Sequence, residues 1–261
     1  MNSGVVRLGG MALSNGVLVH GPTAWACAIR DREGRIQVAA RRKRVAASRV
    51  ANPALRGPAS VVEALALLPQ VKRALPAAKL PFERPGVVAA MAGAASLGRA
   101  LRRSRLRPLT QELAGGVLAL APAILALRRG EVAGYHGAEH VSIGTYEHGE
   151  TRPREHERCG THLVGPMLVA GAAGNVAARR LPERLRPTGR VAAALGSLAF
   201  SGELFAWMTR HPEHPVSRLL ARPGHELQHR LATEEPTPAQ LEVADAALQA
   251  CLRLEDVDDD A

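Results

Sequence analysis

Four apolar segments constrain the fold of this chain more than any other feature: residues 86–98, 112–127, 163–178 and 191–208. A helix that spans a bilayer needs about 20 mostly apolar residues, and the last segment is the one that clearly meets this length. Abundant small residues favour close helix packing in lipid, but the mean hydropathy of −0.05 also suits a soluble helical core. The sequence therefore predicts several apolar helices, with membrane spanning as the favoured interpretation.

Arginine is concentrated in two connections between these segments, RALRRSRLRP at 99–108 and RRLPERLRPTGR at 179–190. Under the positive-inside rule, short loops of this kind are cytoplasmic. We then expect a multi-pass protein of the bacterial plasma membrane, with the stretch between the second and third segments on the opposite face. If the segments do not span, the cytoplasm is the expected location.

The net charge of +10 favours anionic membrane lipids as partners. Nucleic acid is not expected as a partner, because aromatic residues that could stack on bases make up only 3% of the chain. The sequence also lacks a recognisable nucleic-acid reader motif.

The complete pattern predicts a mainly α protein with a small N-terminal antiparallel β element. Residues 16–40 contain three strand-like runs, VLVH, WACAIR and RIQVAA, separated by Gly-Pro and Asp-Arg-Glu-Gly turn signals. Residues 52–80 then predict an amphipathic helix. Its positions near helical spacing are Val61, Val62, Leu65, Leu68 and Val71 or Lys72.

These features divide the chain into four predicted regions. They are an N-terminal β module (1–50), an amphipathic helix with a linker (51–85), an apolar helical core with a His-rich metal loop (86–210), and C-terminal soluble helices with an acidic tail (211–261). In the last region, Thr237-x-x-Gln240 is a capping-box pattern that predicts the start of an amphipathic helix. The basic run at 41–44 predicts an exposed edge.

Residues 135–162, YHGAEHVSIGTYEHGETRPREHERCGTH, hold half of the ten histidines of the chain. If the first part is helical, His136 and His140 lie at i and i+4 on one face, where two imidazoles can bind one ion. The order His-x-x-Glu-His is the inverted zincin pattern, in which Glu139 takes a proton from the water on the metal. The stretch therefore predicts a divalent metal site, with zinc as the expected ion.

Two ligand sets fit this stretch. In a closed set, His156 and Cys159 join His136 and His140 in a four-ligand structural site. In an open set, the two helical histidines recruit Glu203, the only charge in the apolar run 191–208, and one position stays vacant for water. A buried carboxylate such as Glu203 needs a proton, a partner or a metal.

Each ligand set predicts a different class of protein. The open set predicts a zinc-dependent hydrolase of the membrane in which Glu139 is catalytic, with peptide and lipid-ester bonds as candidate substrates. The closed set predicts a non-catalytic membrane scaffold or interaction protein with a structural zinc ion. The sequence alone leaves both hypotheses open.

Several pieces of the chain, in this order, resemble a known bacterial family. They are GGMALSNGVLVHGPTAWACAIRDREGRI, RGPASVVEAL, YHGAEHVSIGTYEHGE, HERCGTH, FSGELF and PGHELQHRLATEEPTPAQLEVADAAL. The family is that of domain of unknown function 1385, the YqhQ-like proteins. The resemblance implies a multi-pass membrane protein with a predicted metal dependence. The positions that match those of the family are Glu63, His136, Glu139, His140, His156, Cys159, Glu203 and Glu235.

The chain departs from the family pattern near its start. Asn15 stands where members usually have a glutamate, and His20 stands where they usually have an arginine. We therefore expect no carboxylate or guanidinium chemistry from these two positions.

Overall fold

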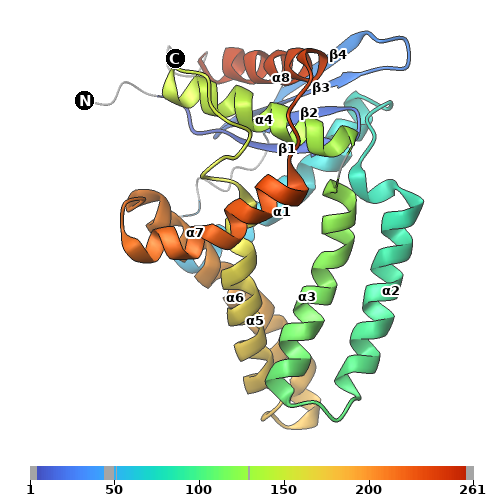
Figure 1. Cartoon of the computed structure of the whole chain (residues 1–261), viewed down its shortest axis with the longest axis vertical. Coiled ribbons are helices and arrows are strands. Elements are labelled where there is room, and N and C mark those ends of the chain that lie inside the picture. The colour runs from blue at the N-terminus through green and yellow to red at the C-terminus, as the bar shows by residue number, and fades with distance from the viewer. Residues whose placement is uncertain (1–4, 44–49, 51, 129, 257–261) are drawn as a thin grey trace.

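The structure is a computed structural model that describes residues 5–43, 50, 52–128 and 130–256. It consists of a head, in which helices cover a small sheet, and a stalk of four helices that extends from it (Figure 1). The predicted fold class, mainly α with a small N-terminal antiparallel sheet, is confirmed.

The sheet is an antiparallel meander in the order β1-β2-β3-β4. Strands β2 (Gly16–His20), β3 (Ala24–Arg30) and β4 (Ile36–Arg42) correspond to the three predicted runs. The sequence did not predict β1 (Gly9–Leu13), since its two glycines and its short length carry little strand signal. Leu13 pairs with Gly16 across a two-residue turn. Among the described strands, β1 has β2 as its single neighbour and so lies at an edge of the sheet.

Helices cover both faces of the sheet. α1 (Pro53–Ala74) packs on one face, and α4 (Glu131–His148) and α8 (Pro238–Asp256) pack on the other. The alternation along each strand supplies both cores, since neighbouring side chains point to opposite faces. The core under α4 and α8 includes Val17, Val19, Ala26, Ala28, Ile143, Val243 and Leu248. The core under α1 includes Leu13, Leu18, Trp25, Ile29, Leu67 and Val71.

The C-terminal helix therefore shares a core with the N-terminal strands. The predicted capping box begins it: Gln240 N–H donates to Thr237 Oγ1 over 3.3 Å, and Thr237 N–H donates to Gln240 Oε1 over 3.0 Å. Near its end, the Glu255 carboxylate accepts hydrogen bonds from the backbone N–H groups of Thr23 and Ala24. Of the predicted acidic tail and basic run, residues 257–261 and 44 lie outside the described residues.

The predicted amphipathic stripe of α1 is only partly correct. Leu68 and Val71 are buried against the sheet, whereas Val61, Val62 and Leu65 are exposed. The reason is that the first half of the helix leaves the sheet and crosses α6 (Arg186–Arg210) instead. At this crossing a Cβ on Gly202 would lie 3.4 Å from Gly57 Cα, so the two backbones approach closely.

All four predicted apolar segments are helical and together form the stalk. They lie in α2 (Pro85–Arg102), α3 (Pro108–Leu127), α5 (Val164–Ala178) and α6, which pack as two hairpins joined by contacts of α3 with α5. Two helical stretches, Pro108–Leu127 and Glu183–Arg210, are long and apolar enough to cross a membrane. The sequence had identified only the last segment as long enough; the other qualifies because α3 begins four residues earlier than the apolar run.

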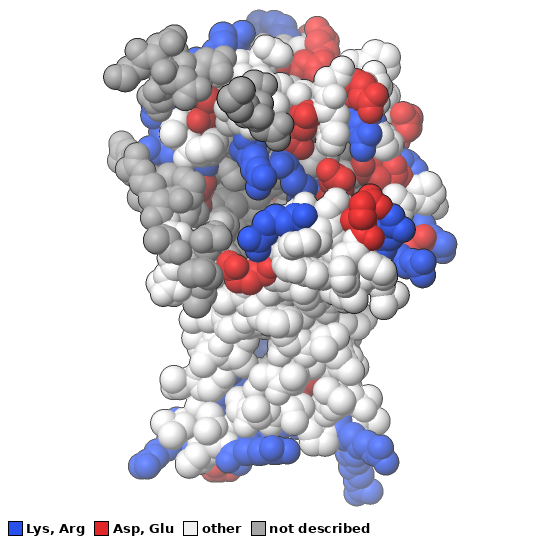
Figure 2. Space-filling view, turned by 90° about the vertical axis from the view of Figure 1, so that its left-hand side faces the viewer, with Lys and Arg blue, Asp and Glu red and all other residues white. Residues whose placement is uncertain are grey.

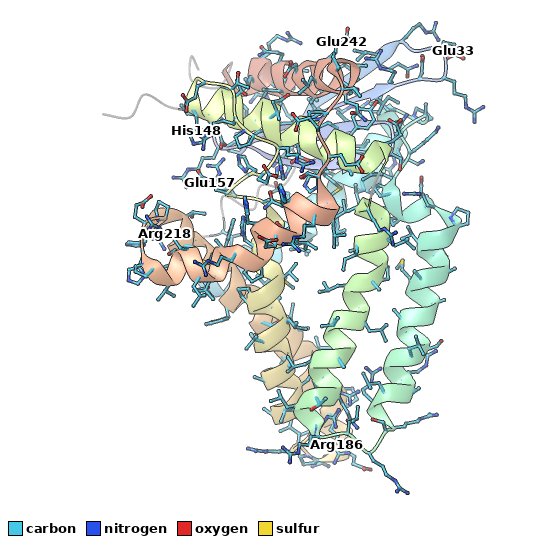
Figure 3. All side chains as sticks on the ribbon, viewed as in Figure 1. Glu33, His148, Glu157, Arg186, Arg218 and Glu242 are labelled. Carbon is cyan, nitrogen blue, oxygen red and sulfur yellow. The ribbon has the colours of Figure 1, made fainter. Side chains whose placement is uncertain are left out.

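The stalk carries apolar side chains on its outside. Between the charged head and a basic base, Figure 2 shows a waist almost free of charged residues. Exposed apolar residues of the stalk include Val88, Met91, Leu97, Val117, Leu125, Val169, Val191, Leu195 and Phe200. The two arginine-rich connections lie together at the base, far from the head, as the position of Arg186 in Figure 3 illustrates.

From the stalk, the chain returns to the head through α7 (Pro215–Leu227) and a π-helical turn, Gln228–Ala232. Short 3-10 turns at Pro81–Glu83, Gly160–Leu163 and Glu183–Leu185 complete the described structure.

Candidate metal centre

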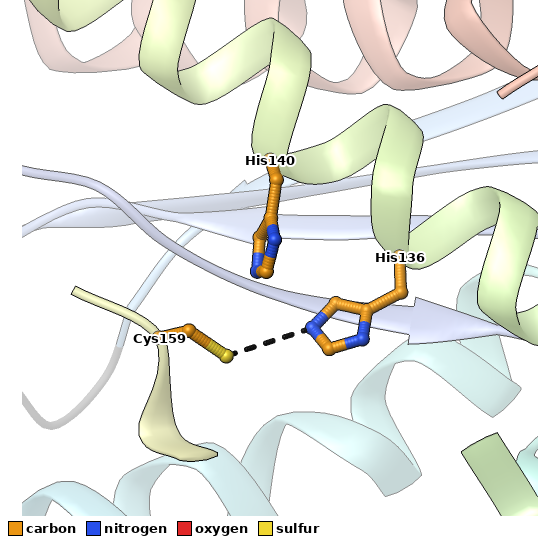
Figure 4. Close-up of side chains that lie close together, drawn as sticks. All are labelled: His136, His140 and Cys159. Carbon is orange, nitrogen blue, oxygen red and sulfur yellow. Dashed lines mark hydrogen bonds between the residues drawn. The ribbon is translucent and has the colours of Figure 1, made fainter. Parts of the chain in front are cut away.

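Three ligand atoms converge beneath α4. His136 and His140 project from the same side of the helix, with ring centroids 4.3 Å apart and side chains almost fully buried. Cys159, at the end of the connection after α4, approaches them, and its Sγ lies 3.7 Å from His136 Nε2 (Figure 4). One ligand atom from each of the three residues lies within 4.8 Å of the other two.

Backbone carbonyls set the tautomers of both histidines. His136 Nδ1 lies 2.8 Å from the carbonyl oxygen of Ala232, and His140 Nδ1 lies 2.6 Å from that of Arg154. Because a carbonyl oxygen only accepts, each Nδ1 carries the hydrogen and each Nε2 keeps its lone pair. Burial lowers the pKa of His140 well below its usual value, and the nearby His136 adds to this effect. Oriented neutral imidazoles of this kind are the form that binds metals.

Gly137, which lowers helix propensity, has a packing reason to be there. A Cβ at this position would collide with the carbonyl oxygen of Glu234, in the segment that follows the π-helical turn. That segment is bound to α4 by the Glu234 N–H, which donates to the Ala133 carbonyl over 3.0 Å. The missing side chain therefore lets the Ala232 carbonyl reach His136.

Glu139 is buried beside these ligands, with only 6% of its surface exposed. Its carboxyl lies against β1, where a Cβ on Gly10 would come within 2.5 Å of Glu139 Cδ. Within the described part of the chain, its Oε2 atom has no hydrogen-bond partner. Burial raises the pKa of Glu139 to about 7; proximity to His136 opposes this rise and Cys159 adds to it. The carboxyl can therefore take up and release a proton near neutral pH.

These groups line a cavity of about 440 Å³ between α1, α4, β1 and α6. Its polar lining includes His136, Glu139, His140 and Cys159, and most of its remaining wall is apolar. The volume is within the range of about 300–1,000 Å³ that is typical of small-molecule sites.

The remaining predicted ligands line the same cavity but lie outside the group of three. His156 Nε2 lies 3.3 Å from a Glu147 oxygen, and His156 Nδ1 accepts the Arg158 N–H, so both ring nitrogens have protein partners. Glu203 reaches the cavity from α6. The structure thus brings Cys159 to the two helical histidines, and places His156 and Glu203 around them.

Of the other family-matched positions, Glu63 lies in the head and Glu235 is exposed. Glu63 forms an ion pair with the buried ammonium of Lys43, and His20 Nδ1 lies 3.7 Å from the same carboxylate. Asn15 anchors the turn after β1 by accepting the Lys79 N–H over 2.9 Å. The two positions that depart from the family pattern therefore have structural partners.

Sequence reasoning missed Gln228, a fully buried residue in the π-helical turn. Its amide donates to Thr161 Oγ1 over 2.8 Å and to the His156 carbonyl over 3.2 Å, and its Oε1 accepts the His156 N–H over 2.8 Å. These bonds fasten the connection that carries Cys159. A single glutamine in a polar stretch gives no motif by which this role could have been found.

The fold and the site define a protein with a buried His/His/Cys cluster in a charged head, above a stalk of apolar helices. Residues 125–254 match the family described as "Protein of unknown function (DUF1385)", a range that begins near the end of α3 and reaches into α8. The chain belongs to this family.

One relative is the "Uncharacterized protein YqhQ" of Bacillus subtilis (strain 168), which is 33% identical over 129 residues. The matched region covers 46% of this chain and 40% of the relative, so less than half of either protein is compared. No solved structure matches the chain.

Proposed function

We propose that the protein is a zinc-dependent hydrolase that works at a membrane. One observation carries this proposal: a buried carboxyl group, that of Glu139, lacks a partner on one oxygen in the described structure and adjoins three converging metal-ligand atoms. A buried polar atom without a partner costs about 1–3 kcal/mol, so this oxygen calls for a partner such as a water molecule or a substrate. A water molecule in the cavity could donate a hydrogen bond to this Glu139 oxygen.

The donor set fits zinc. Two imidazole nitrogens with free lone pairs and one sulfur are common zinc ligands, and three protein ligands leave the fourth position that a catalytic site needs. When bound, the ion supplies Lewis-acid activation of a water molecule and of a scissile carbonyl. The carbonyls of Ala232 and Arg154 hold the two imidazoles in place before the ion arrives.

In this proposal Glu139 transfers the proton. It takes a proton from the attacking water and passes it to the leaving group, which requires a carboxyl that ionises near neutral pH. Burial in the wall of the cavity raises the pKa of Glu139 to about 7 in the metal-free protein, which supports this role. Neither His156, which is paired with Glu147, nor Glu203 is assigned a ligand role in this arrangement.

The Glu139→Gln variant tests the assignment, since it keeps the shape of the side chain and removes the proton transfer. We expect it to bind zinc as tightly as the wild type and to lose turnover. Glu150→Gln, which changes an exposed carboxylate close to the end of α4, is the matched control and should keep both properties. If Glu139→Gln has no functional defect, the alternative of a non-catalytic scaffold with a structural zinc site is favoured.

Two further variants separate the candidate third ligands. Cys159→Ser should weaken zinc binding strongly and abolish the thiolate-to-metal charge-transfer band of the cobalt form. Glu203→Gln should leave both nearly unchanged. The reverse result would assign the third position to Glu203.

For location, we propose that the stalk inserts into the bacterial plasma membrane. Two observations support this: α3 and α6 are long and apolar enough to cross, and apolar side chains cover the waist in Figure 2. Large exposed apolar surfaces are rare on soluble monomers and are typical of membrane or interaction surfaces. Insertion should make the protein resistant to extraction from vesicles with alkaline carbonate, whereas release into the soluble fraction would contradict the proposal.

The arginines at the base would then bind anionic lipid headgroups. The residues that provide this charge are Arg99, Arg102, Arg103, Arg105, Arg107, Arg180, Arg184, Arg186 and Arg190. Each basic residue near an anionic surface contributes about 1 kcal/mol. Replacing three of them with glutamine should reduce binding to phosphatidylglycerol vesicles more than binding to phosphatidylcholine vesicles, and an equal effect on both would exclude headgroup recognition.

A further inference from the structure

Strand β1 presents an open backbone edge to the cavity that contains the candidate metal centre. It is the first strand of the sheet and pairs only with β2 among the described strands. Leu8, Gly9 and Gly10 line the cavity next to His136 and Glu139. The unpaired edge of a sheet offers N–H and C=O groups to any strand that can reach it.

The register shows which residues offer these groups. In an antiparallel pair, every second residue directs both its N–H and its C=O toward the neighbouring strand. Leu13 and Gly16 flank a two-residue turn and so form a hydrogen-bonded pair, which makes Gly9 and His20 a hydrogen-bonded pair as well. Gly10, between these positions, therefore directs its N–H and C=O away from β2. No hydrogen bond to these two groups from outside the sheet is found within the described residues.

The absence of side chains keeps this edge accessible. Gly9 and Gly10 leave their backbone uncovered, and the nearest side chains on the two faces of the strand are those of His20 and Glu139. An added strand would lie about 4.8 Å from β1, between α1 and α4. A peptide group hydrogen-bonded to Gly10 would then lie close to the Glu139 carboxyl group.

One wall of the cavity, formed by α1, Leu163 and α6, is mostly apolar. Its apolar side chains include those of Val61, Ala64, Leu163, Leu198 and Phe205, and Glu203 of α6 is charged. An extended polypeptide directs alternate side chains to opposite sides. It could therefore bond to the backbone of β1 and place apolar side chains against this wall. The ester group of a lipid, unlike a peptide group, has no donor for the C=O groups of the strand.

We propose that β1 binds an apolar polypeptide as an added strand, so that the substrate class of this site is an extended peptide segment and not a lipid ester. The cleavage step rests on the proposed function, because the bound peptide would have its carbonyl next to the water that Glu139 activates. Binding itself needs only the strand and the cavity. Peptide recognition through sheet edges is a general mode, with backbone bonds for affinity and side-chain pockets for specificity.

Binding can be measured without turnover. The full-length protein in nanodiscs, treated with a chelator, is titrated with a fluorescently labelled apolar peptide, and one N-methyl group is moved along the peptide. N-methylation removes one donor and keeps every side chain. We expect a loss of about tenfold in affinity at every second position, where the amide faces β1, and little change at the positions between.

Amide hydrogen exchange supplies a matched readout on the protein. Bound peptide should slow the exchange of the Gly10 amide by at least about tenfold, while the Gly9 amide, already bonded to β2, stays the same. The other edge strand, β4, lies outside the cavity lining and should show no change.

The outcomes separate this inference from the proposed function. A period-two pattern in a protein that binds no zinc and cleaves nothing would establish the peptide site and refute the hydrolase. Zinc binding with hydrolysis of a lysophospholipid, and no peptide binding, would support the hydrolase and refute the peptide site. Peptide binding that tolerates N-methylation equally at every position would overturn strand addition.

Discussion

Gly10→Ala should disable the proposed hydrolase while leaving its metal site intact. The new Cβ would lie 2.5 Å from Glu139 Cδ, whereas carbon atoms in contact prefer about 3.5 Å, so the carboxyl must move by about 1 Å. A displacement of about 1 Å at a reacting group can reduce the rate about 100-fold. The same crowding should reduce stability by about 1–3 kcal/mol, because the core around β1 must adjust. The three atoms nearest to the added methyl group all belong to Glu139.

The assay is turnover of quenched fluorescent apolar peptides by the zinc-loaded protein in nanodiscs, together with zinc affinity and thermal unfolding. Gly165→Ala is the control, because a Cβ there would have open space within 4 Å. We expect zinc affinity to be equal in both variants and turnover to fall only in Gly10→Ala. Full turnover in Gly10→Ala would refute the requirement for a fixed Glu139, and loss of zinc would show that the effect passes through the ligands instead.

Three further substitutions test the packing around the site. Gln228→Leu should lower the free energy of unfolding by about 2–4 kcal/mol, measured by denaturant titration, because it leaves buried backbone groups of the cysteine connection without partners. Burial, with help from a neighbouring lysine, lowers the pKa of His20 to about 4 from 6.5. Wild-type stability should therefore fall by about 3 kcal/mol as the pH drops from about 6.5 to about 4, and His20→Gln should flatten that profile; an unchanged slope would contradict the assignment. Gly202→Val should separate α6 from Gly57 and lower the melting temperature, whereas Gly196→Val, on an open part of the same helix, should not.

Local periodicity explains what the sequence predicted well. The spacing of His136 and His140 depends only on helix geometry, and the structure brings both rings to one side of α4. The apolar segments and the last three strands could be predicted equally well, since each carries its own pattern of apolar residues. Choosing the third ligand was a different kind of problem. Cys159 and Glu203 are both distant along the chain, and only the path of the intervening connections decides which reaches the imidazoles.

The features missed by the sequence depend on tertiary contacts. β1 is held by its pairing with β2 and by contacts with α4, and its glycines gave no strand signal. His156, predicted as a ligand in the closed set, has Glu147 and Arg158 as partners, which its spacing from Cys159 does not reveal. Glycines in α4 lowered helix propensity in isolation, but Gly137 admits the backbone of another segment.

The hydrogen bond from His136 to the carbonyl of Ala232 has a consequence for how the molecule is made. Both hairpins of the stalk precede residue 232 in the chain, so the ribosome releases these helices while one imidazole still lacks its orienting partner. The core of the head also needs α8, since the side chains of this helix pack with those of the strands made first. The candidate centre should therefore be completed among the last steps of biogenesis, after most of the chain has been made.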